Sequence, residues 1–357
     1  MIDCQIPSDE VVFVGTHLQI EKAQALRGLL AANKIKVEYF EVKEKIKSET
    51  FGRALKEKLN SLNRLEGSLV FNASCGSRLA VLTASHVCSE FDIPVYVVEP
   101  TQDRISWVAP TLYDSVDVAD KIQISQFLQA YQTEVFRYID FKSVHSDRAF
   151  SIFKQWLEKA NAYSNAFGRL NAITSKANSN HVTGKLPNHL GDTQRLISDL
   201  IRLGYAIENE KEQLVYTNET CRKMGMGMWL EYITLALVDD LREELPTIQD
   251  IGWGVEVMRH NDSLRNELDV CFLANNKLHV VECKTKKYQS GEVKSIIHQL
   301  EVLADLMGGY SARGALVSLK PVSSNDSLRA EELGIKIFGP NHLPNLKAHM
   351  KRWIEQA

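Results

Sequence analysis

The chain is poor in the features that mark secreted, membrane-bound or fibrous proteins. Its six cysteines are scattered over 357 residues and form no Cys-x-x-Cys pair, which disfavours both a disulfide framework and a structural zinc site. No run approaches the roughly 18 consecutive apolar residues that a membrane-spanning helix needs. The first residues lack a basic segment followed by an apolar one, so no signal peptide is expected. These absences predict a cytoplasmic protein without a membrane partner.

The chain also lacks an excess of either charge. Its 42 Lys and Arg residues stand against 45 Asp and Glu residues, giving a net charge of −3, which excludes a uniformly basic nucleic-acid coat but not a local basic groove. Hydrophobic residues make up 44% and charged residues 24%, as in soluble globular proteins. At this length one core is rarely sufficient, so two or three domains are expected.

The first part of the sequence alternates short apolar runs with amphipathic stretches. Val11–Val14 is wholly apolar, which is typical of a strand buried on both faces. Further strands are expected at residues 36–40, 68–71 and 94–98, and helices at about 20–30, 51–62 and 78–89. This alternation predicts an α/β fold with a Rossmann-like layer, in which a parallel sheet has right-handed crossovers.

Two loops that follow strands of this layer are candidate binding loops, since ligands of such sheets sit beyond the carboxyl ends of the strands. They are Gly15–His17 and Asn72–Arg78. The second combines small and hydroxyl residues with a helix N-terminus, whose free N–H groups favour anions, and Arg78 adds a cation suited to phosphate. An ordinary helix cap explains the same residues equally well. Neither a dinucleotide-binding nor a P-loop glycine motif is present.

The middle part, from about residue 120 to 225, is predicted to be mostly helical and to end in a winged-helix-like pattern. A helix over Thr193–Leu203 is stopped by Gly204, and residues 205–208 and 214–217 form a hairpin, the wing. This wing is acidic, with Glu208, Glu210 and Glu212. Acidic residues argue against DNA reading, so we favour a spacer or an interaction role.

The third part of the sequence places charged residues between apolar ones. Asn275-Asn276 is a favourable two-residue hairpin turn, because Asn tolerates positive φ. In the register that this turn sets, Asp269 faces Glu282, and Lys284 shares the face of Glu282 because it lies two residues away. A one-residue slip would separate the three. The pattern therefore predicts two carboxylates and an ammonium on one face of a hairpin.

This set of groups suits phosphodiester hydrolysis with a divalent metal. Asp269 and Glu282 are able to hold Mg²⁺ or Mn²⁺ while positions for water and substrate stay open. The metal lowers the pKa of its water and attracts the phosphate. Lys284 would orient the nucleophile and stabilise the charge of the transition state. The three residues are therefore the predicted catalytic residues.

Three neighbours extend the predicted metal site. The carbonyl of Cys283 completes the metal shell, Glu231 from a helix expected over residues 228–241 is a further ligand, direct or through water, and Glu267 is a second candidate. An ordinary ion pair on a solvated strand explains a lone Glu-x-Lys motif. Here apolar residues flank the motif, and burying three charges among them costs several kcal/mol unless they are paired or bind metal.

The carboxylates and the lysine resemble the PD-(D/E)xK signature of restriction-endonuclease-like nucleases. Residues 266–270 and 282–285 look like one branch, which joins an N-terminal CARF (CRISPR-associated Rossmann fold) sensor to such a nuclease in type III CRISPR defence. Asn72–Arg78 resembles the ligand loop of that branch, usually closer to Asn-x-Thr-Gly-Gly-Thr-Lys. Where Thr, Gly, Thr and Lys are usual, this chain has Ser74, Cys75, Ser77 and Arg78. The resemblance spans essentially the whole chain.

The resemblance implies a homodimer whose two CARF domains form one two-fold pocket for a cyclic oligoadenylate, most often cyclic tetra-adenylate. The ligand must bind the active arrangement more tightly than the resting one. The activity implied is metal-dependent cleavage of single-stranded DNA, RNA or both, with nicking of DNA. The ligand-binding residues implied are Thr16, His17, Asn72, Ser74, Cys75, Gly76, Ser77 and Arg78. His17 is equally well explained as an ordinary loop residue.

These interpretations divide the chain into three domains. They are a CARF-like ligand-sensing domain (1–145), a helical and winged-helix-like linker (146–225) and a restriction-endonuclease-like α/β nuclease domain (226–357). Two other functions fit the same residues. The first is a constitutive restriction- or repair-type DNA nuclease whose Rossmann-like part only dimerises, and activity without a ligand would favour it. The second is a non-catalytic ligand-sensing regulator that binds DNA through its winged helix, and a gel shift without cleavage would favour it.

Overall fold

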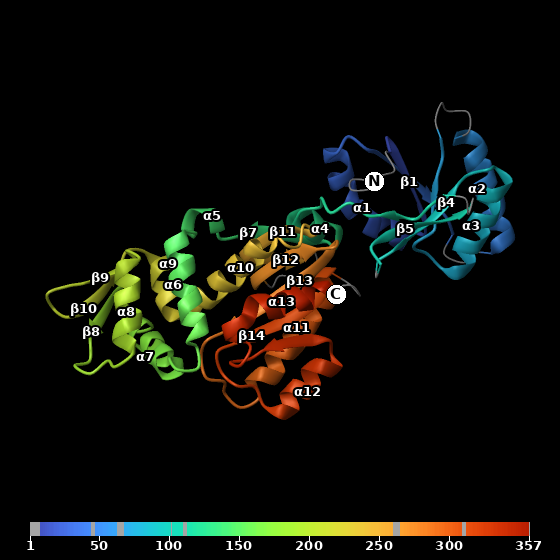
Figure 1. Ribbon diagram of the computed structural model, residues 1–357. Coiled ribbons are helices and arrows are strands. Elements are labelled where there is room, and N and C mark those ends of the chain that lie inside the picture. The colour runs from blue at the N-terminus through green and yellow to red at the C-terminus, as the bar shows by residue number, and fades with distance from the viewer. Residues whose placement is uncertain are drawn as a thin grey trace. The chain divides into compact units, whose positions relative to one another are not determined.

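The computed structural model describes residues 8–43, 47–62, 68–100, 102–109, 113–259, 265–308 and 312–356. It divides into two compact units, Met1–Ile122 with Gln129–Gln132 and Gln123–Leu128 with Thr133–Ala357 (Figure 1). The three-domain division remains a prediction, and the structure groups its second and third parts in one unit. Within these residues, no helix has the length and apolarity that crossing a membrane requires.

The first unit contains the expected alternation of strands and helices. Its parallel strand pairs are β1 (Glu10–Gly15) with β2 (Lys36–Glu41), and β3 (Phe71–Asn72) with β4 (Val95–Glu99). Its helices are α1 (His17–Ala32), α2 (Ser48–Leu62) and α3 (Arg78–Glu90). The α2 and α3 helices share an apolar core, in which Phe51, Leu55 and Leu59 recur at helical spacing.

The sheet of this unit differs from the single parallel sheet that the sequence predicted. Among the described residues, the β1–β2 pair forms a sheet of its own, separate from that of β3 and β4. Two further strands, β5 (Arg104–Ala109) and β6 (Val116–Asp117), extend β4 in antiparallel fashion. In the first four residues of β5, Arg104 and Ser106 alternate with Ile105 and Trp107, which suits a strand with one solvated face rather than a doubly buried one.

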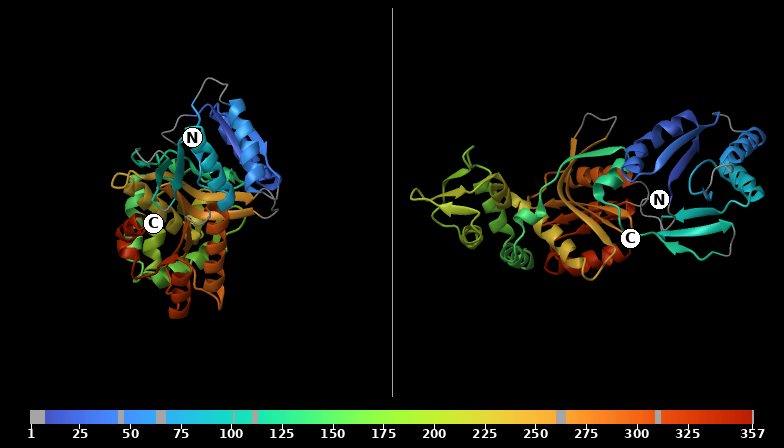
Figure 2. Two further views of the ribbon diagram at one scale, coloured as in Figure 1. Left: turned by 90° about the vertical axis from the view of Figure 1, so that its right-hand side faces the viewer. Right: turned by 90° about the horizontal axis from the view of Figure 1, so that it is seen from above.

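The second unit is built on a six-stranded sheet in the order β15-β14-β13-β12-β11-β7 (Figure 2). The strands are β7 (Thr133–Arg137), β11 (Ile248–Arg259), β12 (Arg265–Ala274), β13 (Lys277–Lys284), β14 (Arg313–Ser318) and β15 (Ile335–Phe338). β13, β14 and β15 are parallel, so their carboxyl ends share one edge. β7 precedes residue 145 and nevertheless pairs with β11, so part of the predicted sensor domain belongs to this sheet.

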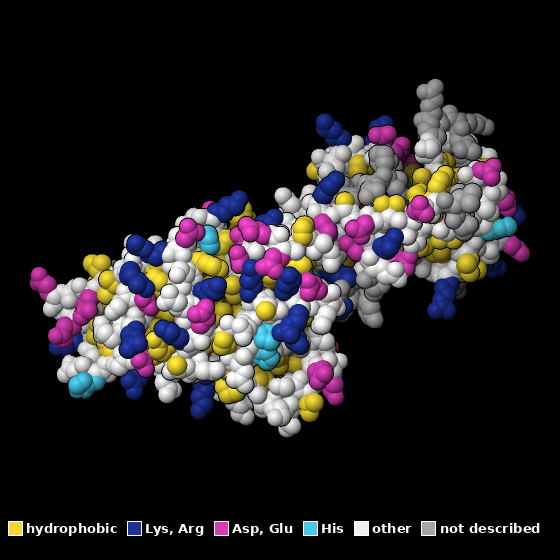
Figure 3. All heavy atoms as spheres, in the orientation of Figure 1, with side chains coloured by type: hydrophobic (Ala, Val, Ile, Leu, Met, Phe, Trp, Pro, Cys, Tyr) yellow, Lys and Arg dark blue, Asp and Glu magenta, His cyan; other side chains and the backbone are white. Residues whose placement is uncertain are grey.

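The middle of the chain forms the predicted winged-helix-like module. Its elements are α6 (Asp147–Glu158), α7 (Ser164–Thr174), β8 (Val182–Lys185), α8 (Thr193–Arg202), β9 (Ala206–Glu208) and β10 (Gln213–Tyr216). Gly204 has φ 73° and ends α8, which confirms the predicted helix and hairpin. Acidic side chains gather at the tip of the hairpin, at the far left of Figure 3, where Glu208 and Glu210 are exposed.

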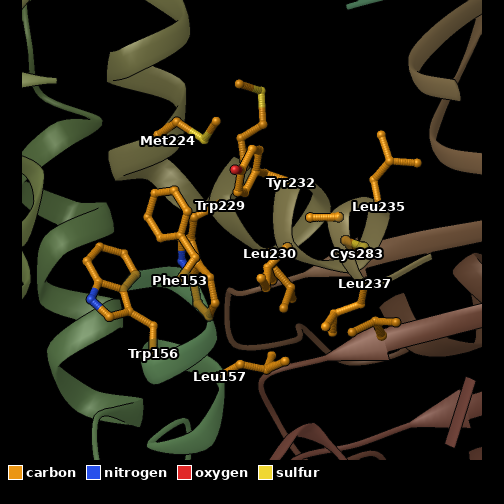
Figure 4. Close-up of a cluster of buried hydrophobic side chains, with 14 of the residues drawn as sticks. Phe153, Trp156, Leu157, Met224, Trp229, Leu230, Tyr232, Leu235, Leu237 and Cys283 are labelled. Carbon is orange, nitrogen blue, oxygen red and sulfur yellow. The ribbon is translucent and has the colours of Figure 1, made fainter. Parts of the chain in front are cut away.

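One apolar core joins this module to the six-stranded sheet. Its centre is Trp229 of α10 (Trp229–Leu241), whose indole stacks on Phe167 of α7 at 4.7 Å and meets Trp156 of α6 edge-on at 5.4 Å (Figure 4).

The remaining elements are α4 (Ile124–Ala130), α5 (Phe141–Val144), α9 (Glu219–Lys223), a π-helical turn (Met224–Met228), α11 (Glu292–Gly308), α12 (Ser324–Glu332), a 3₁₀ turn (Leu343–Asn345) and α13 (Leu346–Glu355).

A fully buried histidine in the sheet gives this unit an acid-sensitive stability. His279 stacks on Phe272 at 4.6 Å and places Nδ1 3.0 Å from the Lys277 carbonyl, while its Nε2 has no hydrogen-bond partner among the described residues. Burial lowers its pKa to about 3. An unfolded histidine titrates near pH 6.5. Between this pH and about pH 3, the histidine therefore binds a proton in the unfolded chain but not in the folded chain. The stability is full above about pH 6.5 and falls as the pH drops towards about 3.

We expect His279→Phe to remove this dependence. Between pH 6 and pH 5, the free energy of unfolding should fall more steeply in the wild type than in the variant, by about 1.4 kcal/mol per pH unit. Urea unfolding at the two pH values measures the difference. His298 on α11 is exposed, and His298→Asn is the control that should keep the wild-type slope. Equal slopes in all three proteins would contradict the prediction.

Candidate active site and binding loop

The predicted hairpin is present with the predicted register. Asn275 and Asn276 have φ values of 49° and 55°, as a two-residue turn with two left-handed residues requires. From this turn the β12–β13 ladder continues without a shift to the Val270–Val281 pair. The turn chemistry therefore sets which side chains of the two strands face each other.

The next residues along the two strands bring the three predicted catalytic groups together. The Lys284 ammonium lies 3.5 Å from Asp269 Oδ2 and forms an ion pair with Glu282. Asp269 also accepts a hydrogen bond from the backbone N–H of Cys283 at 2.8 Å, which fixes its carboxylate across the two strands. The side chains are only 15% (Asp269), 17% (Glu282) and 23% (Lys284) exposed. Charged groups so buried must be paired or bind a ligand.

Glu231 reaches the same site from the first turn of α10, as the sequence predicted. Its carboxylate accepts a hydrogen bond from Trp253 Nε1 at 3.1 Å. Burial raises the pKa of Glu231 well above the usual range, and the negative charge of Asp269 adds to the effect. Glu267 is exposed and lies opposite Glu256 in the ladder. It contributes to the site at a distance, since its charge raises the pKa values of Glu231 and Glu282.

The charge of the site is unbalanced. Burial and the neighbouring Asp269 raise the pKa of Glu282. Burial also disfavours the Lys284 ammonium, but Asp269 and Glu282 outweigh this effect and its pKa is raised. One ammonium therefore faces the three carboxylates of Glu231, Asp269 and Glu282. As the side chains stand, no group of three or more His, Cys, Asp and Glu residues in the described part of the chain is arranged to hold a metal ion.

A glycine turn beside this site has no counterpart in the sequence prediction. Gly227 lies in the π-helical turn before α10 with φ 126°, a conformation open to glycine but strained for other residues. A Cβ at this position would stand 2.2 Å from Thr285 Oγ1. Thr285 follows Lys284 directly, so the turn packs against the end of β13. A lone glycine carries no sequence signal of such an approach.

We expect Gly227→Ala to be strongly destabilising, because the new methyl group meets both the strained backbone and Thr285. The backbone conformation alone costs about 1–3 kcal/mol, and the clash adds to it. Gly168 in α7 has open space around its Cβ position, so Gly168→Ala is the matched control and should raise stability by about 0.5–1 kcal/mol. Thermal and urea unfolding measure both variants. An unchanged Gly227→Ala protein would show that the turn is tolerant.

The predicted binding loop after β3 is built around two side chains that hold it in place. Asn72 Oδ1 accepts hydrogen bonds from the backbone N–H of Ser74, at 3.0 Å, and from its hydroxyl. Ser74 Oγ in turn accepts from the Val98 N–H of β4 at 2.7 Å. Ser77 caps α3 by accepting from Ala80 N–H at 3.2 Å, so the helix cap of the alternative interpretation is present. These contacts leave the outer part of the loop to face solvent.

An open pocket of about 380 Å³ lies at this loop. It is lined by Ala73, Ser74, Cys75, Gly76, Arg78, Val81 and Leu82. Gly76 has φ 129°, so the loop needs a glycine there. Thr16 and His17 are not among the lining residues. Thr16 N–H donates to Gln19 Oε1 at 2.9 Å, and His17 Nδ1 lies 3.7 Å from Glu41. The structure thus gathers the second loop into a pocket but not the first.

An α/β unit with a candidate binding loop, followed by a sheet that carries paired carboxylates and a lysine, is the arrangement expected of a sensor–nuclease. Residues 218–357 match the family model described as "Card1-like, endonuclease domain". The whole chain is 30% identical to protein VC1899 from Vibrio cholerae, with a TM-score of 0.92, over 99% of this chain and 93% of that one. The chain therefore belongs to the CARF-domain nucleases with a Card1-like endonuclease domain, which confirms the predicted fold class and the prediction of an endonuclease.

Two more distant solved structures share the fold. Can2 from Sulfobacillus thermosulfidooxidans, solved in complex with cyclic tetra-adenylate, has 21% identity and a TM-score of 0.79, over 98% of this chain and 94% of that one. A type III CRISPR defence DNA nuclease activated by cyclic oligoadenylate has 13% identity and a TM-score of 0.55, over 92% of this chain and 46% of that one. No curated protein sequence matches the chain.

Proposed function

We propose that this endonuclease is a metal-dependent homodimer that a cyclic oligoadenylate, first of all cyclic tetra-adenylate, activates to cleave single-stranded nucleic acid in type III CRISPR defence. The observation that carries the proposal is the meeting of Asp269, Glu282 and Lys284 at the end of the β12–β13 hairpin. The pocket at Arg78 supports the sensing half. The cyclic tetra-adenylate bound to Can2 and the cyclic oligoadenylate activation of the CRISPR DNA nuclease support the choice of ligand.

The donor atoms of the site fit a divalent metal. Carboxylate oxygens are the ligands that Mg²⁺ and Mn²⁺ prefer, and Mg²⁺ is usually held by one or two carboxylates together with water and substrate phosphate. Asp269 and Glu282 would be these two, with the Cys283 carbonyl beside them and Glu231 held close by Trp253. The site has three carboxyl groups and one ammonium, and a bound cation would favour the charged forms of Glu231 and Glu282 that burial disfavours. When bound, the metal supplies a water of lowered pKa and neutralises phosphate charge.

The protein's own groups then have separate roles. Lys284 keeps its proton at neutral pH, because its pKa is raised, so it acts as a hydrogen-bond donor and not as a base. Its ammonium would hold the attacking water and stabilise the charge that grows on the phosphoryl oxygens. Asp269 accepts the Cys283 N–H, which holds the carboxylate in place before substrate arrives. Glu231 stands on the α10 side, where burial disfavours its charged form and a bound cation would favour it.

A two-fold dimer suits a ring-shaped activator, because a symmetric ligand matches a symmetric interface. The helix that starts at the binding loop supports this pairing. Leu79 and Leu82 of α3 are 49% and 70% exposed, and Leu82 also lines the pocket. A second copy of the chain would cover these apolar side chains next to the ligand. Arg78 would then contact a phosphate of the ring.

Metal dependence is tested by removal and titration. We expect EDTA to abolish cleavage and Mn²⁺ or Mg²⁺ to restore it. Glu282→Gln keeps the shape of the side chain and loses its charge, so it should raise the metal concentration for half-maximal cleavage by about 10- to 100-fold. Glu301 on α11 is an acid whose side chain is 38% exposed, and Glu301→Gln should need the same metal concentration as the wild type. Full cleavage in EDTA would refute the metal site.

A further inference from the structure

We infer that Asn171 and Thr285 are positioning residues, which hold the end of the catalytic strand against the turn that leads into α10. The inference rests on the proposed function, since it assigns these residues to the site of Lys284 and Glu231. Asn171 belongs to α7 of the winged-helix-like module, far from both groups in the sequence. The module is thereby part of the nuclease site and not only a spacer.

One hydrogen-bonded side chain connects the three elements. With its amide oxygen towards Thr285, Asn171 accepts from Thr285 Oγ1 at 3.1 Å, and its amide nitrogen donates to the carbonyls of Gly225 at 3.3 Å and of Phe167 at 3.2 Å. Thr285 is buried and directly follows Lys284. Gly225 lies in the turn that leads to Glu231. A single amide therefore fixes the strand end of Lys284 relative to the helix start of Glu231.

Close packing on both sides keeps this arrangement fixed. At Gly225, a Cβ would stand 2.5 Å from the hydroxyl of Tyr216 and 3.0 Å from Thr174 Oγ1. These two hydroxyls are hydrogen-bonded to each other at 2.7 Å in the core. At Gly227, a Cβ would collide with the side chain of Thr285. The turn is thus enclosed between the module and the strand, and π-helical turns of this kind are frequent at functional sites.

The position of the anchor explains why it matters for chemistry. β13 ends at Lys284, whose carbonyl makes the last ladder contact by accepting from Leu319 N–H at 2.9 Å. Beyond it, the Thr285 side chain is the next attachment of the strand. A displacement of about 1 Å at a reacting group is able to cost 100-fold in rate. Releasing Thr285 should therefore misplace the Lys284 ammonium without changing how substrate or activator is held.

Four variants test the inference kinetically. Asn171→Ala and Thr285→Val each remove one half of the contact and should lower kcat by about 10- to 100-fold, with unchanged KM for the oligonucleotide and unchanged half-saturation by cyclic tetra-adenylate. The double variant should be no worse than the singles, because both remove the same contact. Thr285→Ser keeps the hydroxyl and should restore wild-type kcat.

A second contact of the same helix is the matched control. Ser164 of α7 accepts from Lys320 Nζ at 2.7 Å, a contact of the same helix that involves neither Asn171 nor Thr285. Ser164→Ala should leave kcat unchanged. An equal loss of kcat in Ser164→Ala would show that only the general docking of α7 matters and would overturn the inference. Additive losses of kcat in the double variant would also overturn it. So would an effect of the variants on KM alone.

Hydrogen exchange gives a test that does not depend on catalysis. Amides of residues 285–288 should exchange at least about tenfold faster in Asn171→Ala and Thr285→Val than in the wild type, because local opening follows the loss of the anchor. Unchanged exchange would overturn the inference. If the wild-type protein cleaves no nucleic acid with any cyclic oligoadenylate, the proposed function fails, while the exchange result still decides whether this contact fixes the strand.

Discussion

Lys284→Ala is expected to lower the rate of nucleic-acid cleavage about a thousand-fold, the upper range for loss of one transition-state donor. The ammonium lies 3.5 Å from Asp269 and pairs with Glu282, so its removal leaves two buried carboxylates without their cation. The fold depends on the whole sheet, and the proposed activator pocket lies in the other unit. We therefore expect both to persist in the variant when metal is present.

Single-turnover cleavage of a labelled oligonucleotide at saturating activator measures this loss. Lys286 lies two residues further on, is 62% exposed and pairs with Glu292. Lys286→Ala is the matched control and should cleave at a rate within about twofold of the wild type, since exposed ion pairs contribute little. A Lys284→Ala protein with wild-type turnover would remove Lys284 from the mechanism.

Arg78→Ala is expected to shift activation and leave the chemistry intact. Arg78 is exposed and lines the pocket at the start of α3, where its guanidinium would meet a phosphate of the activator. A hydrogen bond to a charged group contributes about 1.5–3 kcal/mol. The activator concentration for half-maximal cleavage should therefore rise about 10- to 100-fold, while the rate at saturating activator stays the same.

A titration of cleavage against cyclic tetra-adenylate separates these two quantities. Arg53 of α2 is an exposed arginine in the same unit but not part of the pocket lining, and Arg53→Ala should activate as the wild type does. If the Arg78→Ala curve overlays that of the wild type, the proposed phosphate contact is wrong. A lowered rate at saturation would place Arg78 in transmission of the signal instead.

The β12–β13 hairpin was predictable because its determinants are local. Two asparagines set the turn, and the turn sets the register of the two strands. This register brings Asp269, Glu282 and Lys284 together. Glu231 was predictable because the apolar pattern around it is helical. In each case a few neighbouring residues define the geometry. The wing hairpin after Gly204 follows the same logic.

The contacts that support the site were not predictable from the sequence. Asn171 and Thr285 are 114 residues apart, and an asparagine in a helix gives no sign of its partner. In the sequence, Gly227 does not differ from other glycines, and only the fold shows that Thr285 lies beside it. The strand β5 joins the sheet by antiparallel pairing with β4, and β6 joins it by pairing with β5. Long-range packing decides all three features.

The central claim is that ligand binding activates the nuclease. The most direct test incubates the protein with single-stranded DNA, single-stranded RNA and supercoiled plasmid in Mn²⁺ or Mg²⁺, with and without cyclic tetra- or hexa-adenylate, beside Glu282→Ala. We predict cleavage by the wild type only when a cyclic oligoadenylate is present, and none by the variant. Equal cleavage without any ligand would contradict the claim and indicate a constitutive nuclease. A DNA gel shift without cleavage in every condition would instead indicate a regulator.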